Sequence, residues 1–209
     1  MKNAIDADFL IFDLGNVIID IDYQNSLRLI RNHLSELIQD RVTGFYLTDF
    51  HKDYEKGLID SPTFRNSVRS YFDQDWEDQK VDELWNSLLV TIPANRLELI
   101  AKLKNKYQIG VLSNTNQIHI EAVDTMLKRD HGIENLNELF HRVFLSHEMG
   151  LSKPSPEIYE KMVSELGTTP DRVVFFDDLE ANVKGAASVG IQAVHVTGPE
   201  VIFDYLKHA

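Results

Sequence analysis

The stretch that decides the fold is Phe9-Leu10-Ile11-Phe12-Asp13-Leu14-Gly15-Asn16-Val17, near the start of the chain. Its first four residues are all apolar, which is typical of a strand that is buried on both faces of a parallel sheet. A carboxylate, Asp13, follows directly, and a glycine comes two residues later. Active sites of open α/β sheets lie at the carboxyl ends of the strands, so Asp13 is predicted to lie at such a site.

Short apolar runs alternate with amphipathic stretches over the second half of the chain. The runs that predict buried strands are residues 109–112, 143–145, 173–176 and 193–196. The stretches that predict helices are residues 121–128, 156–166, 180–189 and 200–207. With the strand that ends at Asp13, this alternation predicts an α/β fold, a Rossmann-like, doubly wound parallel sheet of about five strands.

The span of residues 23–92 has a different pattern of apolar residues. Its apolar residues recur at helical spacing, and it contains no convincing buried strand. The clearest helical patterns are Leu27-Ile30-Leu34-Leu37 and Val81-Leu84-Trp85-Leu88-Leu89. The many aromatic residues of this span are expected to form a core of its own, with one or two of them at the substrate pocket.

A break divides this helical span at residues 57–62. Ser61 is expected to cap the following helix, with Pro62 at the first helical position. We therefore predict a helical cap domain at residues 23–92, inserted into a core domain that consists of residues 1–22 and 93–209. Such a cap could stand over the carboxyl edge of the sheet and exclude water from the site.

Composition narrows the class of partner. The chain of 209 residues has 33 acidic and 21 basic residues, a formal net charge of −12, which disfavours binding to nucleic acid or to an anionic membrane. The absence of cysteine excludes disulfides, thiolate metal sites and a cysteine nucleophile. No run approaches the roughly 18–20 apolar residues of a membrane span, and residues 1–8 lack the apolar region of a secretory signal. We therefore expect a cytoplasmic protein with a small-molecule partner.

Polar motifs follow the predicted ends of four strands. They are Asp13 with Gly15 and Asn16, then Ser113-Asn114-Thr115-Asn116, then Lys153-Pro154, and finally Asp177-Asp178. Because the carboxyl ends of parallel strands meet at one edge of the sheet, these groups are expected to converge. Carboxylates, an ammonium and neutral donors can together bind a phosphate and a hard divalent cation such as Mg²⁺.

Phosphoryl transfer is the reaction that suits these groups. Asp13 can attack phosphorus, Lys153 and the metal can neutralise the phosphoryl oxygens, and Ser113 can donate a hydrogen bond to them. Water would then hydrolyse the aspartyl-phosphate.

Each residue also has an ordinary structural explanation. A strand-end aspartate often caps a helix, Ser113 and Asn114 could do the same, and most lysines lie on the surface. Asn182 could brace the acidic loop or lie exposed. The eight histidines have no spacing typical of a transition-metal site and are expected to be structural or surface groups. Only the joint placement of the four motifs favours function.

The four motifs, in this order, resemble those of the haloacid-dehalogenase-like hydrolase superfamily, subfamily I, with its helical C1 cap. The resemblance covers nearly the whole chain and is closest to the branch with the bacterial sugar-1-phosphate phosphatases and the amino-terminal phosphatase domain of soluble epoxide hydrolases. Those relatives carry similar Phe-Asp-Leu-Gly-Asn-Val, Leu-Ser-Asn-Thr-Asn and Phe-Phe-Asp-Asp signatures.

The resemblance implies a Mg²⁺-dependent hydrolase of a small phosphorylated metabolite, such as a sugar phosphate. It implies that Asp13 is the nucleophile and that Lys153 is also catalytic. The phosphate would be held by Ser113, Asn114 and Lys153. The metal would be held by Asp13, the Gly15 carbonyl, Asp178 and Asp177.

Gly15 is the one departure from the family pattern. Most phosphatases of the superfamily carry a second aspartate at this position, which protonates the leaving alcohol and then activates water. Such acid–base help is typically worth about 10²–10⁴-fold in rate. Candidates for a replacement are Asp20, Asp22, His51, Asp53 and Glu55. The segment Tyr54-Glu55-Lys56-Gly57 is of special interest, since a break between cap helices can project side chains toward the crevice.

Two alternatives stay open. The 2-haloacid dehalogenases also lack the second aspartate, but they use no metal and resemble Ser-Ser-Asn where this chain has Phe176-Asp177-Asp178. Adjacent acids beside Asp13 repel one another unless a cation lies among them, which favours the phosphatase. The loss at Gly15 also permits a non-catalytic protein that binds phosphate and metal. The sequence names neither the substrate nor the oligomeric state, monomer or homodimer.

Overall fold

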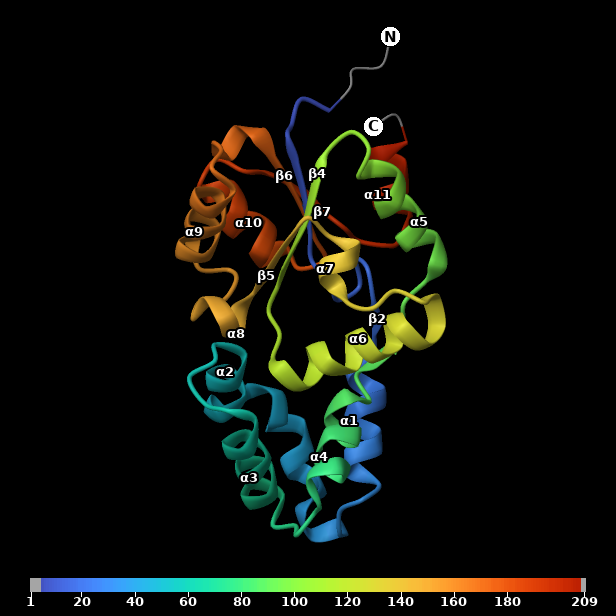
Figure 1. The fold of residues 1–209 in the computed structure, drawn as a ribbon. Coiled ribbons are helices and arrows are strands. Elements are labelled where there is room, and N and C mark those ends of the chain that lie inside the picture. The colour runs from blue at the N-terminus through green and yellow to red at the C-terminus, as the bar shows by residue number, and fades with distance from the viewer. Residues whose placement is uncertain (1–4, 208–209) are drawn as a thin grey trace.

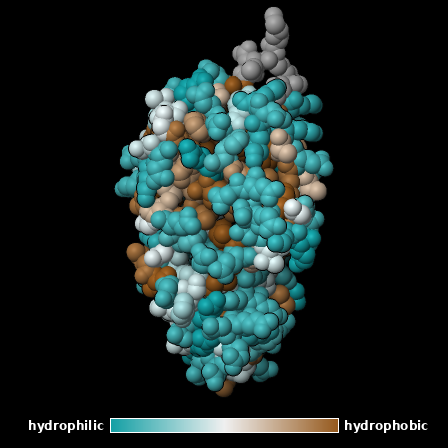
Figure 2. Space-filling model, viewed as in Figure 1, coloured by the Kyte–Doolittle hydropathy of each residue, from teal (hydrophilic) through white to brown (hydrophobic). Residues whose placement is uncertain are grey.

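The computed structural model describes residues 5–207; residues 1–4, part of the N-terminal segment considered above, and residues 208–209 lie outside it. Figure 1 shows a wider lobe that holds the sheet and a narrower helical lobe beside the carboxyl ends of the strands. Hydrophilic residues cover most of the face seen in Figure 2. Within the described residues, no helix combines the length and the apolar character needed to cross a membrane.

A parallel sheet of five strands forms the centre of the wider lobe, which confirms the predicted fold class. Its spatial order is β5-β4-β1-β6-β7. The strands are β1 (Phe9–Phe12), β4 (Gln108–Ser113), β5 (Arg142–Leu145), β6 (Val173–Asp177) and β7 (Gln192–His195). Strand β1 pairs with both β4 and β6, so its carboxyl end lies where the chain order reverses, the usual place of a ligand in such sheets.

Helices cover both faces of the sheet (Figure 1). Leu10 and Phe12 pack on the face covered by α5 (Ala94–Leu103), α6 (Gln117–His131) and α11 (Glu200–Leu206). Ile11 packs on the opposite face, against α9 (Pro156–Leu166) and α10 (Glu180–Ser188). Alternate side chains of β1 therefore enter two different cores, which explains its unbroken apolar run. The short helices are α7 (Leu136–Leu139), α8 (Ser146–Met149) and η2 (Pro170–Arg172).

The second lobe is helical and has a core of its own. Its elements are α1 (Tyr23–Arg31), η1 (Glu36–Leu47), α2 (Asp49–Glu55), α3 (Ser61–Phe72) and α4 (Asp78–Asn86). Its buried side chains include Phe45, Phe64, Phe72 and Trp85 and form a cluster separate from the two clusters of the sheet lobe. The domain boundaries given above stay a prediction, which these separate cores support.

Two chain crossings join the lobes. The antiparallel strands β2 (Asp20–Ile21) and β3 (Leu89–Thr91) lie side by side there. The carboxylate of Asp20 lies 2.7 Å from Nη2 of the buried Arg96 on α5. This ion pair links strand β2 to helix α5 of the sheet lobe.

Three details of the predicted cap helices are wrong. The helix through Val81 ends at Asn86, before Leu88, and Leu89 begins strand β3. The helix through Leu27 ends at Arg31, and the chain continues in tighter turns, with Leu34 N–H donating to the Arg31 carbonyl. Such turns have about three residues each, so Leu37 leaves the helical face and is 95% exposed. Asp60, and not Ser61, caps α3, because its carboxylate accepts from Thr63 N–H while Ser61 bonds Tyr54.

Helix α6 begins earlier than its apolar pattern predicts, at Gln117 in place of residue 121. The Asn116 side chain caps it by accepting from His119 N–H. The first turn packs against the helical lobe, with Ile118 in the core of that lobe. The apolar residues of α6 therefore pack against two different cores. A search for one apolar face at helical spacing misses the first turn for this reason.

Leu10 and Leu37 allow one substitution to be compared at a buried and an exposed position. Leu10 is fully buried at the centre of the sheet, and Leu37 is almost fully exposed. We expect Leu10→Ala to lower the free energy of unfolding by about 2–5 kcal/mol, through lost apolar contact and the cavity left behind. Leu37→Ala is expected to change it by about 0.5 kcal/mol or less. Urea denaturation measures both, and equal effects would contradict this packing.

Candidate active site

The four polar motifs converge at the carboxyl edge of the sheet, on the side that faces the helical lobe. Asp13 follows β1, Ser113 ends β4 and Asp177 ends β6. Lys153 enters from the loop between α8 and α9. Asp13, Ser113 and Lys153 line one pocket together with Asn114 and Asp178. The sequence thus predicts correctly that these residues lie together.

The Lys153 ammonium lies at the centre of this cluster. Its Nζ is 2.7 Å from Asp13 Oδ1, 2.6 Å from Asp177 Oδ2 and 3.1 Å from the Leu112 carbonyl oxygen. The side chain is 1% exposed. Burial alone would lower the pKa of Lys153, but the charges of Asp13 and Asp177 outweigh it and raise that pKa. Lys153 is therefore a fixed cation.

Asp177 holds Lys153 from behind. Its carboxylate is fully buried and accepts from Asn182 Nδ2 at 2.9 and 3.1 Å and from Leu179 N–H at 2.8 Å. Asn182 therefore braces the acidic loop, the first of the two roles considered from sequence. Both Asp177 oxygens are thereby occupied by protein donors.

Asp13 and Asp178 present the more available carboxylates. Burial raises the pKa of Asp13 to about 6, and the positive charge of Lys153 opposes that rise. Burial also raises the pKa of Asp178. Asn16, at φ 54°, donates from Nδ2 to Asp178 Oδ2 at 2.9 Å. Asparagine tolerates this left-handed backbone better than most residues. Its hydrogen bond to Asp178 links the first motif to the fourth.

The acidic cluster fits a hard divalent cation. One carboxylate oxygen from each of Asp13, Asp177 and Asp178 lies within 4.8 Å of the others. Three carboxylates face one ammonium, so the site carries excess negative charge, and oxygen is the ligand that Mg²⁺ prefers.

Asn114 positions Lys153 from the second motif. Its side-chain amide donates to the Lys153 carbonyl at 2.9 Å, and its amide oxygen accepts from Lys153 N–H at 2.8 Å. This reciprocal pair fixes the loop that carries the ammonium. Ser113 is 4% exposed and borders the pocket beside it.

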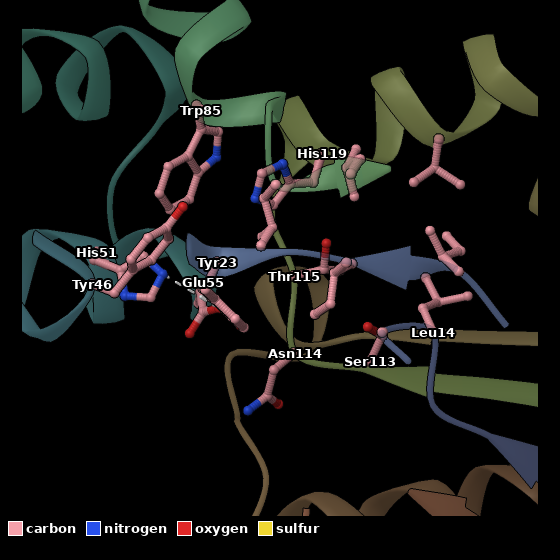
Figure 3. A pocket seen from close by; sticks show the side chains of 16 residues that line it. Leu14, Tyr23, Tyr46, His51, Glu55, Trp85, Ser113, Asn114, Thr115 and His119 are labelled. Atoms are coloured by element: carbon pink, nitrogen blue, oxygen red, sulfur yellow. Dashed lines mark ion pairs between the residues drawn. The ribbon is translucent and has the colours of Figure 1, made fainter. Parts of the chain in front are cut away.

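A second hollow adjoins the first and extends between the two lobes (Figure 3). Both hollows share Gly15, Ile21, Glu55, Ser113 and Asn114 among their walls. The extension has apolar and aromatic walls with a few polar groups. Tyr23, Tyr46 and His51 also line both hollows, and the extension adds Trp85, Leu88, Thr115 and His119.

Two histidines line this hollow, and nothing in their sequence spacing singles them out for it. Burial lowers the pKa of His51 to about 4 and that of His119 to about 3, so both are neutral at pH 7. His119 stacks on Trp85 at 4.7 Å, and its Nδ1 lies 2.8 Å from Asn86 Oδ1. The contact joins α4 to α6, so only the tertiary structure reveals it.

The candidates to replace an acid at Gly15 differ in whether they line the two hollows. Asp20 pairs with Arg96, and Asp22 caps α1 by accepting from Asn25 N–H at 2.9 Å. Asp53 is not among the residues that line either hollow. His51 and Glu55 line both, and His51 Nε2 lies 3.6 Å from Glu55 Oε1.

Comparison with known proteins gives the class. A family model described as haloacid dehalogenase-like hydrolase matches residues 7–190, and the chain belongs to this family. D-ribitol-5-phosphate phosphatase of Bacteroides thetaiotaomicron is 24% identical over 184 residues, 88% of each chain.

Solved structures agree with this class. A HAD family enzyme of Bacteroides thetaiotaomicron, in a magnesium complex, is 30% identical with a TM-score of 0.86, covering 98% of this chain and 100% of its own. The wild-type enzyme of the same name with magnesium and inorganic phosphate is 33% identical with a TM-score of 0.82, covering 90% and 93%.

The buried ammonium makes a testable contribution to stability. Lys153→Met removes the partner of two buried carboxylates, so we expect the free energy of unfolding at pH 8, with a chelator present, to fall by about 3–5 kcal/mol. The loss should be smaller at pH 5. Without the ammonium, the pKa of Asp13 rises further, and protonation then removes its buried charge.

Lys184→Met is the matched control for this measurement. Lys184 pairs with Glu180 at 2.7 Å on the surface, where both side chains are largely exposed, so its loss should leave the unfolding free energy almost unchanged. Urea denaturation at the two pH values measures both variants. An equally small effect at Lys153 would contradict the paired buried cluster.

Proposed function

We propose that the protein is a Mg²⁺-dependent hydrolase of small phosphomonoesters that acts through an aspartyl-phosphate on Asp13. The observation that carries the proposal is the cluster at the carboxyl edge of the sheet, in which one buried ammonium pairs with Asp13 and Asp177 and a third carboxylate, Asp178, lies beside them. A nucleophilic carboxylate, a fixed cation and a metal site are the groups that phosphoryl transfer requires.

Asp13 is the nucleophile in this proposal. Its Oδ1 is held by Lys153, which orients the carboxylate at the mouth of the pocket. Lys153 and Ser113 neutralise and hold the phosphoryl oxygens, and Asn114 keeps Lys153 in place. Asp177 and Asn182 hold the ammonium from the far side.

The metal would be held by Asp13, Asp178 and the Gly15 carbonyl, with Asp177 beside them. Bound there, Mg²⁺ would neutralise the phosphate oxygens and the repulsion among the acids. Both Asp177 oxygens already accept hydrogen bonds from protein donors. Its part is therefore to keep Lys153 and the acidic loop in position.

The substrate is a sugar or polyol phosphate in this proposal. The relative named as D-ribitol-5-phosphate phosphatase matches nearly the full length of both chains. The hollow beyond the phosphate end has aromatic walls, which suit the C–H groups of a sugar or polyol. Its polar side chains, which could bind hydroxyl groups, are Glu55, Thr115, His51 and His119.

The two alternatives fit the site less well. A metal-independent dehalogenase would leave Asp178 and Asp13 in mutual repulsion, since within residues 5–207 only the ammonium of Lys153 lies among the three acids. A protein that only binds phosphate would need no proton donor, and the pocket contains a carboxyl group, Glu55, that can serve as one. A cytoplasmic location and the absence of nucleic-acid and membrane partners stay predictions, as does a monomer or homodimer.

Asp13→Asn tests the nucleophile. The change keeps the size of the side chain but removes its nucleophilic oxygen, so we expect phosphate release to fall at least about 10⁴-fold. The assay is phosphate release with Mg²⁺ from a panel that includes ribitol 5-phosphate and glyceraldehyde 3-phosphate. Asp171→Asn, a change on the surface turn η2, should retain wild-type activity. Equal activity of the wild type and Asp13→Asn would refute the proposal.

Removal of the metal separates the phosphatase from the dehalogenase. A chelator should abolish phosphate release, and added Mg²⁺ should restore it, because the three acids then regain their counter-charge. Halide release from 2-chloropropionate, measured in parallel, is expected to be absent. Halide release that survives chelation would favour the dehalogenase.

A further inference from the structure

We propose that Glu55 of the helical lobe is the proton donor and acceptor of the reaction, in place of the aspartate that the chain lacks at Gly15. The inference rests on the proposed phosphatase function and assigns one catalytic residue within it. It starts from the space around Gly15. Gly15 has no side chain, and the Cδ1 atom of Ile21 lies 2.9 Å from where a Cβ on it would be, so an acid for this reaction must come from another residue.

The backbone fixes Glu55 over the site. Glu55 ends α2, and the Ser146 hydroxyl of α8 donates to its carbonyl oxygen. Two residues later, Gly57 has φ 66°, and a Cβ on it would lie 2.0 Å from the His147 carbonyl oxygen. Only glycine permits so close an approach. The end of α2 is therefore docked directly on the sheet lobe.

The Glu55 side chain points into the shared part of the two hollows. It lines the phosphate end with Asp13 and Lys153 and also lines the aromatic extension. If the phosphate binds beside Asp13 and the alcohol in the aromatic extension, a group at this junction would face the leaving oxygen. In Figure 3, Glu55 lies beside His51 on the side of the pocket formed by the helical lobe.

The groups around Glu55 let it exchange a proton. His51, one turn earlier on α2, lies 3.6 Å away and is neutral. Burial raises the pKa of Glu55 to about 7; the positive charge of Lys153 lowers this pKa, and the negative charge of Asp13 raises it. The pKa of Tyr23 on α1 is raised mainly by burial and next by the negative charge of Glu55. A carboxyl group of this kind is present in both forms near neutral pH.

Two proton transfers complete the reaction. In the first step, an Asp13 oxygen bonds to phosphorus, the bond to the leaving oxygen breaks, and that oxygen takes its proton from the Glu55 carboxyl. In the second step, the Glu55 carboxylate takes a proton from water as the water oxygen attacks phosphorus. The acyl-phosphate bond breaks, which restores the Asp13 carboxylate and releases phosphate. Glu55 ends protonated, as it began.

Glu55→Gln tests this role through the leaving group. An alkyl phosphate needs a proton on its leaving oxygen, whereas p-nitrophenolate leaves as a stable anion. With the fastest alkyl substrate of the panel above, we expect kcat/KM to fall about 10²–10⁴-fold. With p-nitrophenyl phosphate, one nitrophenolate per site should be released in a burst at near wild-type rate. Slow turnover should follow, because the phosphorylated enzyme lacks its base.

Asp53→Asn is the matched control, since Asp53 lies on the same helix but lines neither hollow. It should behave as the wild type with both substrates. If Glu55→Gln lowers kcat/KM for the alkyl phosphate and the burst rate for p-nitrophenyl phosphate by the same factor, its role is merely structural and the inference is overturned. A variant with unchanged activity on both substrates would overturn it as well. A wild type whose activity does not depend on Asp13 would instead overturn the proposed function itself.

The wild-type pH profile needs no variant and so does not depend on how Glu55→Gln folds. The acid must be protonated in the free enzyme, and its pKa is about 7. For the alkyl phosphate, kcat/KM should therefore fall as the pH rises above about 7, while p-nitrophenyl phosphate should show no such fall. Identical profiles for the two substrates would overturn the inference.

Discussion

The ion pairs of Lys153 with Asp13 and Asp177 are the interaction on which the site depends. They bring the ends of β1 and β6 together with the loop after α8 around one buried ammonium. Buried charges are tolerated when each has a partner and further hydrogen bonds, and here Asn182 and the Leu112 carbonyl provide these. The same contacts stabilise the fold and orient Asp13, the proposed nucleophile, so the proposed catalysis and the stability of the fold depend on one set of residues.

The remaining negative charge explains the need for a cation. Asp177 balances Lys153 from a fully buried position, which leaves Asp13 and Asp178 facing the pocket. Family membership and the relatives solved with magnesium agree with this charge balance. In the proposed reaction, the sheet lobe thus supplies the groups that act on phosphorus, and these groups would act in the same way on phosphates of different alcohols.

The helical lobe supplies much of the wall of the second hollow, where the alcohol of the proposed substrate would lie. Its contacts with the sheet lobe include those of α2 with α8, through Glu55 and Gly57, and those of α4 with α6, through the stacked rings of Trp85 and His119. These contacts place aromatic walls, neutral histidines and a carboxyl group around one hollow. In the proposed reaction, chemistry at phosphorus and recognition of the leaving group are therefore divided between the two lobes.

The sequence by itself determined the sheet, its helices and the residues at its carboxyl edge. Apolar runs and the polar residues that end them are local features, and parallel strands bring their ends to one edge. Where local periodicity was a poor guide, as at Leu37 and at the start of α6, tighter turns or contact with a second lobe set the pattern. Only the tertiary structure decided that Asp177 holds the ammonium while Asp178 faces the pocket, and that Glu55 and His119 reach it. The physical reason is that burial, charge partners and pKa depend on contacts between residues far apart in the chain.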